Sequence, residues 1–506
     1  MNQMRLMPQS YEEKIPAGHL VRLVNEAIEA LELEVLLAQY EGGGTSSYHP
    51  KMMLKVLVYA YCKKIYTSRK IAEALEENIH FMWLSGEQTP DFRTLNDFRG
   101  RRMKGVIEAV FSAVVEQLVE KGYVKLEDYF VDGSKVEADA NKHKVVWEKR
   151  RQRYEQNVKT KIKELLQVIE AENAQEEAEY GEKDLESKGG NGSGEETSQA
   201  LKETVKALNE RLKGERSKQT RAALKTLEKD CLPRLEKYEE QEQVLNGRNS
   251  YSKTDPDATC MRMKEDRGAE KAWPKPAYNV QLGTEGQFVV GYSVHTHSSD
   301  PICLIPHLKK LRRQPKQVVA DAAYGSEENY AYLEKQKQGN YLKYPAFYQD
   351  THRYRNPDLI RKHSFRSDRF GYDPQSDEFI CPNQRRLNYL YTSQHKTDNG
   401  YESERRHYEC KTCADCPLKS ECTKAKGNRH IQISFKLIEY RRQARENLTS
   451  ESGIALRKKR AVDVETVFGN IKQNMRFRRF HLRGLEKVNT EWGLVCIAHN
   501  MRKLAS

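Results

Sequence analysis

The chain has 506 residues, a formal net charge of +13 and ten cysteines, which already restrict its class. The length exceeds what one simple core usually serves, so several domains, or one domain with large insertions, are expected. The basic balance favours nucleic acid over a membrane as partner, and no apolar run approaches the roughly 20 residues that span a bilayer. The N-terminus lacks the apolar core of a signal peptide. We therefore expect a soluble cytoplasmic protein whose cysteines are thiols or metal ligands rather than disulfides.

Residues 1–125 show the apolar spacing of helices. Pro50 opens a helix that carries Met53, Leu54 and Leu57 on one face. Two short helices follow within residues 68–102 and resemble a helix-turn-helix, whose second helix could enter a DNA major groove. Its cationic end holds Arg99, Arg101 and Arg102. We expect these arginines to contact DNA; the alternative is a helical bundle with solvated arginines.

Two aspartates directly follow strand-forming residues. Tyr129 to Val131 precede Asp132-Gly133, and the apolar run Val318 to Ala320 precedes Asp321. Asp-Gly is also a common turn pair, so Asp132 alone could be a turn former. A fully apolar strand suits the centre of a sheet, which would place Asp321 at the carboxyl edge where sites of α/β sheets usually lie.

The segment between these aspartates contains a charged helical region and a hairpin. Residues 145–250 predict an antiparallel coiled-coil arm with a flexible tip at 189–194; it could serve in dimerisation, in DNA bracing or as a spacer. Alternation over residues 278–294 predicts an antiparallel hairpin. Beyond it, His295, His297 and Asp300 have conceivable metal spacing, but Ser299 or Asp300 before Pro301 is better explained as a helix N-cap.

Residues 346–435 are rich in cysteine. Cys410, Cys413 and Cys416 are separated by two residues each, Cys422 follows after five, and Cys381 lies upstream. Two-residue gaps let thiolates converge on one ion, so four of these five cysteines are expected to bind a structural metal. Tetrahedral zinc is the first choice, and an iron–sulfur cluster is the alternative.

A basic helix is predicted near the end of the chain, within 457–484. Val464, Phe468, Ile471 and Met475 form its apolar face. Glu465 lies beside that face, with Gly469 and Lys472 one and two turns further on. A lone carboxylate among so many cations is either a salt-bridge partner or a metal ligand. The cations beyond Lys472 that could hold a DNA backbone are Arg476, Arg478, Arg479 and Arg483.

Asp132, Asp321 and Glu465 together have the composition of a two-metal site. Carboxylate oxygens hold Mg²⁺ or Mn²⁺ without displacing all of the ion's water. Two such ions, roughly 3.5 to 4 Å apart, activate an attacking oxygen and stabilise a leaving one in phosphoryl transfer. The three acids are far apart in sequence, so only a fold that brings them together makes them a site.

Three segments carry these acids in order: "YFVDGSKVEADANK", "VVADAAYGSEENYAYL" and "VETVFGNIKQNMRFRRFHLRGLEKV". They resemble the three acidic blocks of bacterial insertion-sequence transposases of the DDE type. The segment "YHPKMMLKVLVYAYCKKIYTSRKIAEAL" resembles their N-terminal helical domain, and the cysteine block resembles an insertion in one branch of that family. The likeness covers most of the chain outside the predicted arm.

The resemblance implies the roles of individual residues. Asp132, Asp321 and Glu465 would be the catalytic acids, and Lys472 would contact a phosphate near the cleavage point. The arginine expected before the glutamate would fall at position 461, which is Ala461 here, so Arg460 is a shifted candidate for contact with DNA. Asp463 is the rival third acid; Glu465 is preferred because it shares a face with Lys472.

The resemblance also implies a mixed α/β, RNase H-like catalytic domain with two insertions, preceded by an all-α domain. The expected boundaries are 1–125 for the helical DNA-binding domain; 126–144, 251–345 and 436–506 for the catalytic domain; 145–250 for the coiled-coil insertion; and 346–435 for the cysteine-rich insertion.

The implied reaction is cleavage of DNA at transposon ends, dependent on two Mg²⁺ or Mn²⁺ ions, followed by attack of the freed 3′-hydroxyl on target DNA. The partners would be terminal inverted repeats and target duplex, bound by a homodimer near the bacterial nucleoid. The alternatives are an RNase H-like nuclease without strand transfer and a catalytically inactive, domesticated DNA-binding protein.

Overall fold

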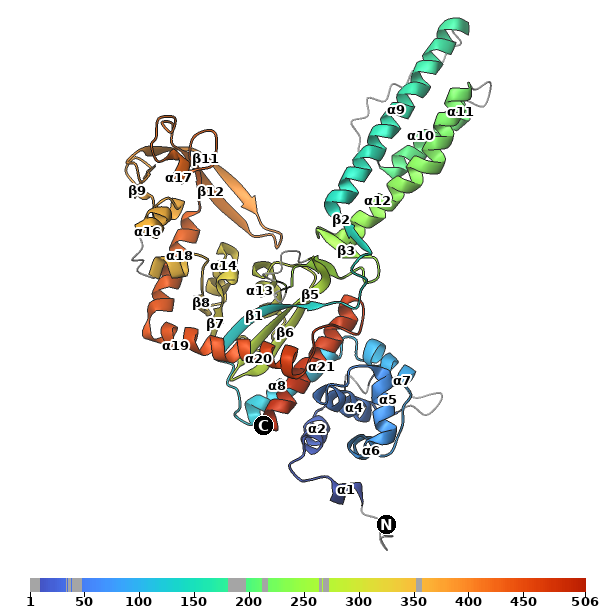
Figure 1. The fold of residues 1–506 in the computed structure, drawn as a ribbon, viewed down its shortest axis with the longest axis vertical. Coiled ribbons are helices and arrows are strands. Elements are labelled where there is room, and N and C mark those ends of the chain that lie inside the picture. The colour runs from blue at the N-terminus through green and yellow to red at the C-terminus, as the bar shows by residue number, and fades with distance from the viewer. Residues whose placement is uncertain are drawn as a thin grey trace. The chain divides into compact units, whose positions relative to one another are not determined.

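The computed structural model describes residues 10–32, 34, 38, 48–180, 197–211, 217–263, 266, 273–351 and 357–506. The predicted tip at 189–194 therefore lies outside the described residues. The chain forms two compact units: residues 1–136 with 279–506, and residues 137–278. Both are drawn in Figure 1. The mixed α/β class expected from the sequence is confirmed by the helices and sheets that follow.

The first unit is organised around one sheet. The hairpin of β5 (Lys275–Glu285) and β6 (Phe288–His295) is antiparallel and confirms the predicted hairpin. Next to β5 lies β1 (Asp128–Glu137), followed by β7 (Gln317–Ala320) and β8 (Gly339–Leu342). Pairing from β1 to β7 and from β7 to β8 is parallel. The carboxyl ends of these three strands therefore meet at one edge of the sheet.

Glycines allow β5 and β6 to approach the aromatic ring of Tyr129 on β1. A Cβ added to Gly283 would lie 1.8 Å from Tyr129 Cζ, and one added to Gly291 would lie 2.0 Å from Tyr129 Oη. Such distances are far inside van der Waals contact, so any side chain at either position would displace the ring. Tyr129 is buried, and the two glycines thus fix the packing over the first strand.

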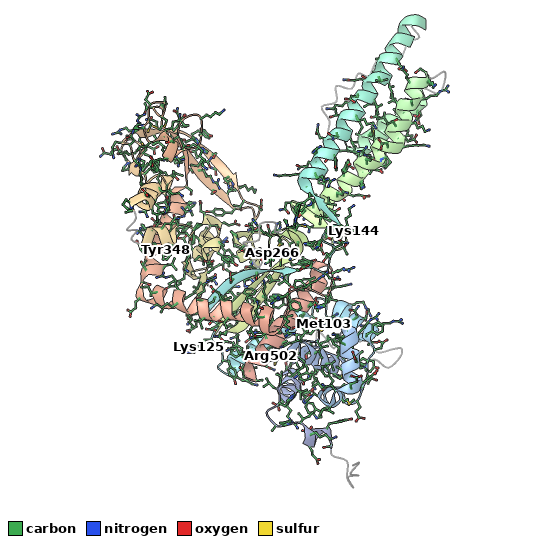
Figure 2. All side chains as sticks on the ribbon, viewed as in Figure 1. Met103, Lys125, Lys144, Asp266, Tyr348 and Arg502 are labelled. Atoms are coloured by element: carbon green, nitrogen blue, oxygen red, sulfur yellow. The ribbon has the colours of Figure 1, made fainter. Side chains whose placement is uncertain are left out.

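The long helix α21 (Leu485–Leu504) covers this sheet and joins it to the N-terminal helices. It packs on β6, α4 (Pro50–Cys62) and α8 (Ile107–Glu120). Arg502, labelled in Figure 2, donates from Nη1 to the Cys62 carbonyl oxygen at 2.8 Å. Tyr66 Oη donates to the Met475 carbonyl oxygen at 2.5 Å. The N-terminal helices and the end of the chain therefore share one core.

The other elements of the first unit connect or cover these parts. The N-terminal helices are α1 (Tyr11–Lys14), α2 (Leu20–Glu29), α5 (Ser68–Glu77), α6 (Ile79–Ser85), α7 (Phe92–Asp97) and the π-helical turn η1 (Phe98–Arg102). Between β6 and the cysteine-rich segment the helical elements are η3 (Pro301–Cys303), α13 (Leu304–Lys309), η4 (Ala322–Tyr324), α14 (Glu327–Lys335), α15 (Phe347–Thr351), α16 (Pro357–Ser364) and η5 (Ser367–Arg369).

The cysteine-rich segment forms a sheet of its own in the order β13-β12-β11-β10-β9. Its strands are β9 (Gly371–Asp373), β10 (Glu378–Ile380), β11 (Arg386–Lys396), β12 (Glu402–Glu409) and β13 (His430–Ile433), with the short helix α17 (Lys419–Cys422) between the last two. Helices α18 (Phe435–Thr449) and α19 (Glu451–Arg460) lead from it to the predicted basic helix.

The second unit contains a helical arm on a small β-structure. Its helical elements are α9 (Glu148–Tyr180), α10 (Ser198–Arg211), α11 (Lys218–Thr226), η2 (Leu227–Cys231) and α12 (Leu232–Leu245). The strands are β2 (Val145–Trp147), β3 (Ser250–Ser252) and β4 (Thr259–Met261). One apolar cluster joins the helices, including Val158, Ile162, Leu201 and Leu235. The predicted apolar seam of the arm is thus buried.

Candidate active site

Two of the predicted acids lie side by side at the edge of the main sheet. Val131 of β1 is paired with Ala320 of β7, so Asp132 and Asp321 occupy the next position on each strand. Neighbouring strands lie about 4.8 Å apart, and paired residues point to the same face. Asp132 does not end its strand, as the sequence suggested, because β1 continues to Glu137. It lies where the pairing with β7 stops.

The third predicted acid reaches Asp132 through an arginine. Arg460 Nη1 lies 3.3 Å from Glu465 Oε1, and Arg460 Nη2 lies 3.6 Å from Asp132 Oδ1. The Arg460 side chain is 7% exposed and that of Glu465 is 58% exposed. The buried guanidinium of Arg460 therefore lies between the carboxylates of Asp132 and Glu465, which are far apart in the sequence.

A local change of helix type makes this contact possible. Helix α19 ends at Arg460, and a π-helical turn, η6 (Ala461–Glu465), follows before α20 (Thr466–Gly469) and a second π-helical segment, η7 (Asn470–Asn474). Hydrogen bonds in a π-helix join residues five apart. Arg460, five residues before Glu465, therefore lies on the same side of the helix. The predicted apolar face is confirmed, since Val464, Phe468, Ile471 and Met475 are buried.

Asp463, the rival third acid, is used elsewhere. Its side chain is buried, and its Oδ1 accepts a hydrogen bond from the Gln287 backbone N–H at 3.0 Å. That contact attaches the helix to the turn between β5 and β6. Asp463 therefore has a structural partner, whereas Glu465 contacts Arg460.

Lys472 lies close to the first strand. Its Nζ donates to the Lys135 carbonyl oxygen at 3.1 Å. Beyond it, Arg476, Arg478, Arg479 and Arg483 are exposed, while Phe477, Phe480 and Leu482 between them are buried. In this segment the apolar side chains pack into the core and the guanidinium groups face the solvent.

Two arginines differ from the sequence-based expectation. Arg99 is 3% exposed, and its Nη1 donates to Tyr61 Oη at 3.0 Å and to the Tyr66 carbonyl oxygen at 2.6 Å. It ties the N-terminal helices together and is not on a DNA-accessible surface. Arg460 is likewise buried among acids. Arg101, by contrast, is exposed and paired with Asp97, and Arg102 is partly exposed. The apolar spacing of a helix does not show which arginine its neighbours enclose.

Asp300 is the N-cap residue of η3, as expected, but its side chain makes no capping hydrogen bond. Its Oδ1 accepts from Lys135 Nζ and Asn279 Nδ2, both at 2.8 Å. A Cβ on Gly133 would lie 2.9 Å from the same oxygen and 2.4 Å from Gln281 Nε2. Gly133, directly after Asp132, thus permits this polar group to pack under the first strand and hold it in place.

One residue of this edge was missed by sequence reasoning. Leu342 of β8 is paired with Ala320, so Lys343 is the residue on the third strand that corresponds to Asp132 and Asp321. The available signal was its position, since Lys343 directly follows the strand-forming residues "NYL" just as Asp321 follows "VVA".

The five cysteines of the predicted metal site line one small cavity, together with Arg385, Lys419 and Arg429. None forms a disulfide. Burial raises the pKa of the thiols of Cys413 and Cys422. Among the described residues, however, no three His, Cys, Asp or Glu side chains are arranged closely enough to hold a metal ion. The cysteines are gathered but do not have ligand geometry.

Comparison with known proteins gives two matches. Residues 380–505 match the family model "Transposase DDE domain", and residues 9–101 match "Transposase domain (DUF772)". The first match includes Glu465 and the five cysteines but neither Asp132 nor Asp321. No curated protein and no solved structure matches the chain.

Both matched families are families of transposases, which indicates that the chain is an enzyme that acts on DNA. Over these two segments the chain is similar to insertion-sequence transposases of the DDE type. In the described part of the chain, no helix is both long and apolar enough to cross a membrane.

Proposed function

We propose that the chain cleaves DNA at transposon ends and joins the freed 3′-hydroxyl to target DNA, with Asp132, Asp321 and Glu465 as catalytic acids. The observation that carries this proposal is the convergence of three distant acidic segments at one sheet edge. Asp132 and Asp321 are neighbours by strand register, and Arg460 connects Asp132 with Glu465.

The strand order supports an RNase H-like catalytic domain. An antiparallel pair, β6 and β5, is followed by β1 and then by two parallel strands, β7 and β8. In this arrangement the first acid lies on the central strand β1 and the second follows its parallel neighbour. The helix that carries the third acid approaches the same edge.

The donor atoms fit divalent cations. Three carboxylates supply the hard oxygen ligands that Mg²⁺ and Mn²⁺ prefer. The buried guanidinium between Asp132 and Glu465 shows that this position attracts positive charge. Two bound ions would activate the attacking oxygen and stabilise the leaving oxygen of the phosphodiester.

The remaining residues of the site bind and orient the DNA. Lys472, which contacts β1, would hold a phosphate near the cleaved bond. The exposed arginines 476, 478, 479 and 483 would hold the backbone on either side, a contribution that falls with salt concentration and carries little sequence information. Because two transposon ends must be cut and joined together, we propose a homodimer in the DNA complex.

The proposal is tested with the full-length chain, a labelled duplex containing the DNA that flanks the coding region, and a supercoiled plasmid as target. With Mg²⁺ or Mn²⁺ we expect cleavage at the ends and covalent joining of the labelled strand to the plasmid. Asp132→Asn, Asp321→Asn and Glu465→Gln should each abolish both steps, whereas the matched control Glu328→Gln should retain them.

Other outcomes would support the rival functions. Cleavage without joining, even when the labelled duplex carries a free 3′-end, would indicate a nuclease of the same fold. Binding of the flanking DNA with no cleavage by the unaltered chain would indicate a catalytically inactive DNA-binding protein. Full activity in the Asp321→Asn variant would refute the proposed acids.

For the cysteine-rich sheet we propose one structural zinc ion held by four of the five cysteines. The five cysteines line one cavity, and the two-residue gaps between Cys410, Cys413 and Cys416 are those of zinc sites. The Arg429 N–H donates to Cys413 Sγ at 3.3 Å, and Asn383 Nδ2 donates to Cys416 Sγ at 3.4 Å. Such donors stabilise thiolates around a metal.

A further inference from the structure

Lys343 completes a row of three residues at the carboxyl edge of the sheet. Val131, Ala320 and Leu342 are in register across β1, β7 and β8. The Lys343 N–H donates to the Ala320 carbonyl oxygen at 3.2 Å, so the alignment persists at the next position. Because in-register residues point to the same face, the Lys343 side chain leaves the sheet on the side of Asp132 and Asp321.

The charged groups around Lys343 are those of the acid site. Its pKa is lowered, first by burial and then by Arg460 and Arg457, while Asp321 and Glu465 act in the opposite direction. Lys343 is only half-buried. The charged groups that act on Lys343 thus come from the residue after β7 and from the helical segment that carries Glu465.

This cation differs from the other two near the acids. Arg460 is paired with Asp132 and Glu465, and Lys472 donates to a backbone carbonyl of β1. Lys343 forms no ion pair with any residue that the structure describes. Lys343 is half-buried beside carboxylates but is not paired with any of them. Its positive charge is therefore available to an anionic substrate.

We propose that the Lys343 ammonium contacts a non-bridging oxygen of the phosphate that is cleaved, which makes it a further catalytic residue; this inference rests on the function proposed above. Water attacks phosphorus, the bond from phosphorus to the 3′-oxygen breaks, and the 3′-oxygen leaves as a hydroxyl with the proton that the water gives up. Lys343 keeps its proton throughout and offsets the charge that gathers on the phosphate oxygens in the transition state.

The test compares Lys343→Gln and Lys343→Arg with the control Lys335→Gln, an exposed lysine on α14. Removing one preorganised donor from a developing oxyanion typically costs about 100-fold in kcat. We expect a loss of that size in Lys343→Gln with KM for the flanking duplex changed only a few-fold, a smaller loss in Lys343→Arg, and unchanged kinetics in Lys335→Gln. The melting temperature shows whether each variant is folded.

A sulfur substitution separates contact from a structural role. In the unaltered chain, replacing the contacted non-bridging oxygen by sulfur should slow cleavage, and in Lys343→Gln the same sulfur should add little further loss, because the two changes remove one interaction. If Lys343→Gln does not fold, the measurement is made on Lys343→Arg, where the sulfur effect at that oxygen should differ from that of the unaltered chain.

Two results would overturn the inference. One is a kcat in Lys343→Gln equal to that of the unaltered chain; the other is a sulfur effect that is fully additive with the substitution. Asp321→Asn is measured alongside. If Asp321→Asn is inactive and Lys343→Gln is fully active, only the inference about Lys343 fails. If Asp321→Asn is itself fully active, the proposed acid site fails.

Discussion

Arg460 and Glu465 are five residues apart and nevertheless in contact, because the turn between them is π-helical. An ordinary α-helix brings together residues three or four apart. The family resemblance places an arginine four residues before the glutamate, where this chain has Ala461. We propose that Arg460 takes the place of that arginine, because the π-helical turn puts it on the same side of the helix as Glu465.

This explanation predicts that one residue of the turn can be removed. Val462 is 60% exposed, and its deletion should convert the π-helical turn to an α-helix while Arg460 and Glu465 stay on one side. We expect a loss of less than about 1 kcal/mol in stability, since only an exposed hydrogen bond from Gln287 to the Val462 carbonyl disappears. Cleavage by the shortened chain should persist.

The matched deletion is Lys458, which is exposed in the α-helical part. Its loss turns Leu456 by about 100° relative to Arg460, and both residues are buried. We expect a much lower melting temperature and no cleavage. Equal damage from the two deletions would contradict the role given to the π-helical turn.

Replacing Arg460 with methionine should make the stability of the protein depend on added divalent cations. Without the guanidinium, Asp132 and Glu465 face each other as uncompensated negative charges. Breaking a fully buried pair costs several kcal/mol, but Glu465 is 58% exposed, so we expect a loss of about 1 to 2 kcal/mol. Mg²⁺ should raise the melting temperature of Arg460→Met more than that of the unaltered chain. An equal Mg²⁺ effect in both proteins would argue against a shared cation position.

Acid should destabilise the first unit through His499. Burial lowers its pKa from 6.5 to about 4. Asn470 Nδ2 lies 2.9 Å from its Nδ1, and its Nε2 lies 3.0 Å from the Gln287 carbonyl oxygen. These distances suit a neutral ring that donates from Nε2. Below pH 6.5 His499 is protonated in the unfolded chain but remains neutral in the folded chain. Its contribution to the free energy of unfolding is therefore fully present above pH 6.5 and declines toward pH 4.

The contribution of this histidine is at most about 3.5 kcal/mol, since one pKa unit corresponds to about 1.4 kcal/mol and the shift from 6.5 to about 4 is 2.5 units. Other groups titrate in the same range, so the measurement is a difference between two proteins. His499→Gln can still donate and accept hydrogen bonds but takes up no proton. Its melting temperature should fall less between pH 7 and pH 4.5 than that of the unaltered chain. Parallel pH curves would contradict the prediction.

Metal analysis of the purified chain should find about one zinc ion per chain and no iron. Cys410→Ser, at one of the most buried sulfurs, should lose the zinc and lower the melting temperature of the cysteine-rich sheet, because zinc binding contributes directly to folding. Cys303→Ser is the control, since Cys303 is buried but lies outside the cysteine cavity. Visible absorption from bound iron would favour the cluster instead.

Parts of the fold and site could be predicted from local patterns. Alternation and apolar runs predict the hairpin β5–β6, the start of β1 and strand β7, because these patterns directly express which faces are buried. Asp321 follows β7 as expected, whereas Asp132 lies inside β1. Glu465 is preferred to Asp463 because it shares a face with Lys472, and Asp463 has a buried contact with Gln287 instead.

Other features depend on distant parts of the chain. Arg99 has the sequence context of an exposed basic helix end, but Tyr61 and Tyr66 enclose it. Asp300 has the sequence context of a helix N-cap, but its carboxylate accepts a hydrogen bond from Lys135 of β1. The position of Lys343 next to Asp321 depends on the register of β8 against β7. In each case the partner lies many residues away, where no local pattern could reveal it.

The shared core of α4 and α21 has a consequence for the newly made chain. Cys62 and Ala498, which are in contact, are 436 residues apart. At synthesis rates of roughly 5 to 20 residues per second, α4 waits about 20 to 90 s for its partner to emerge. Nearly all of α4 is apolar and buried in the finished protein. During that interval the face of α4 that α21 covers has only the other N-terminal helices to pack on, so the shared core forms only after α21 has been made.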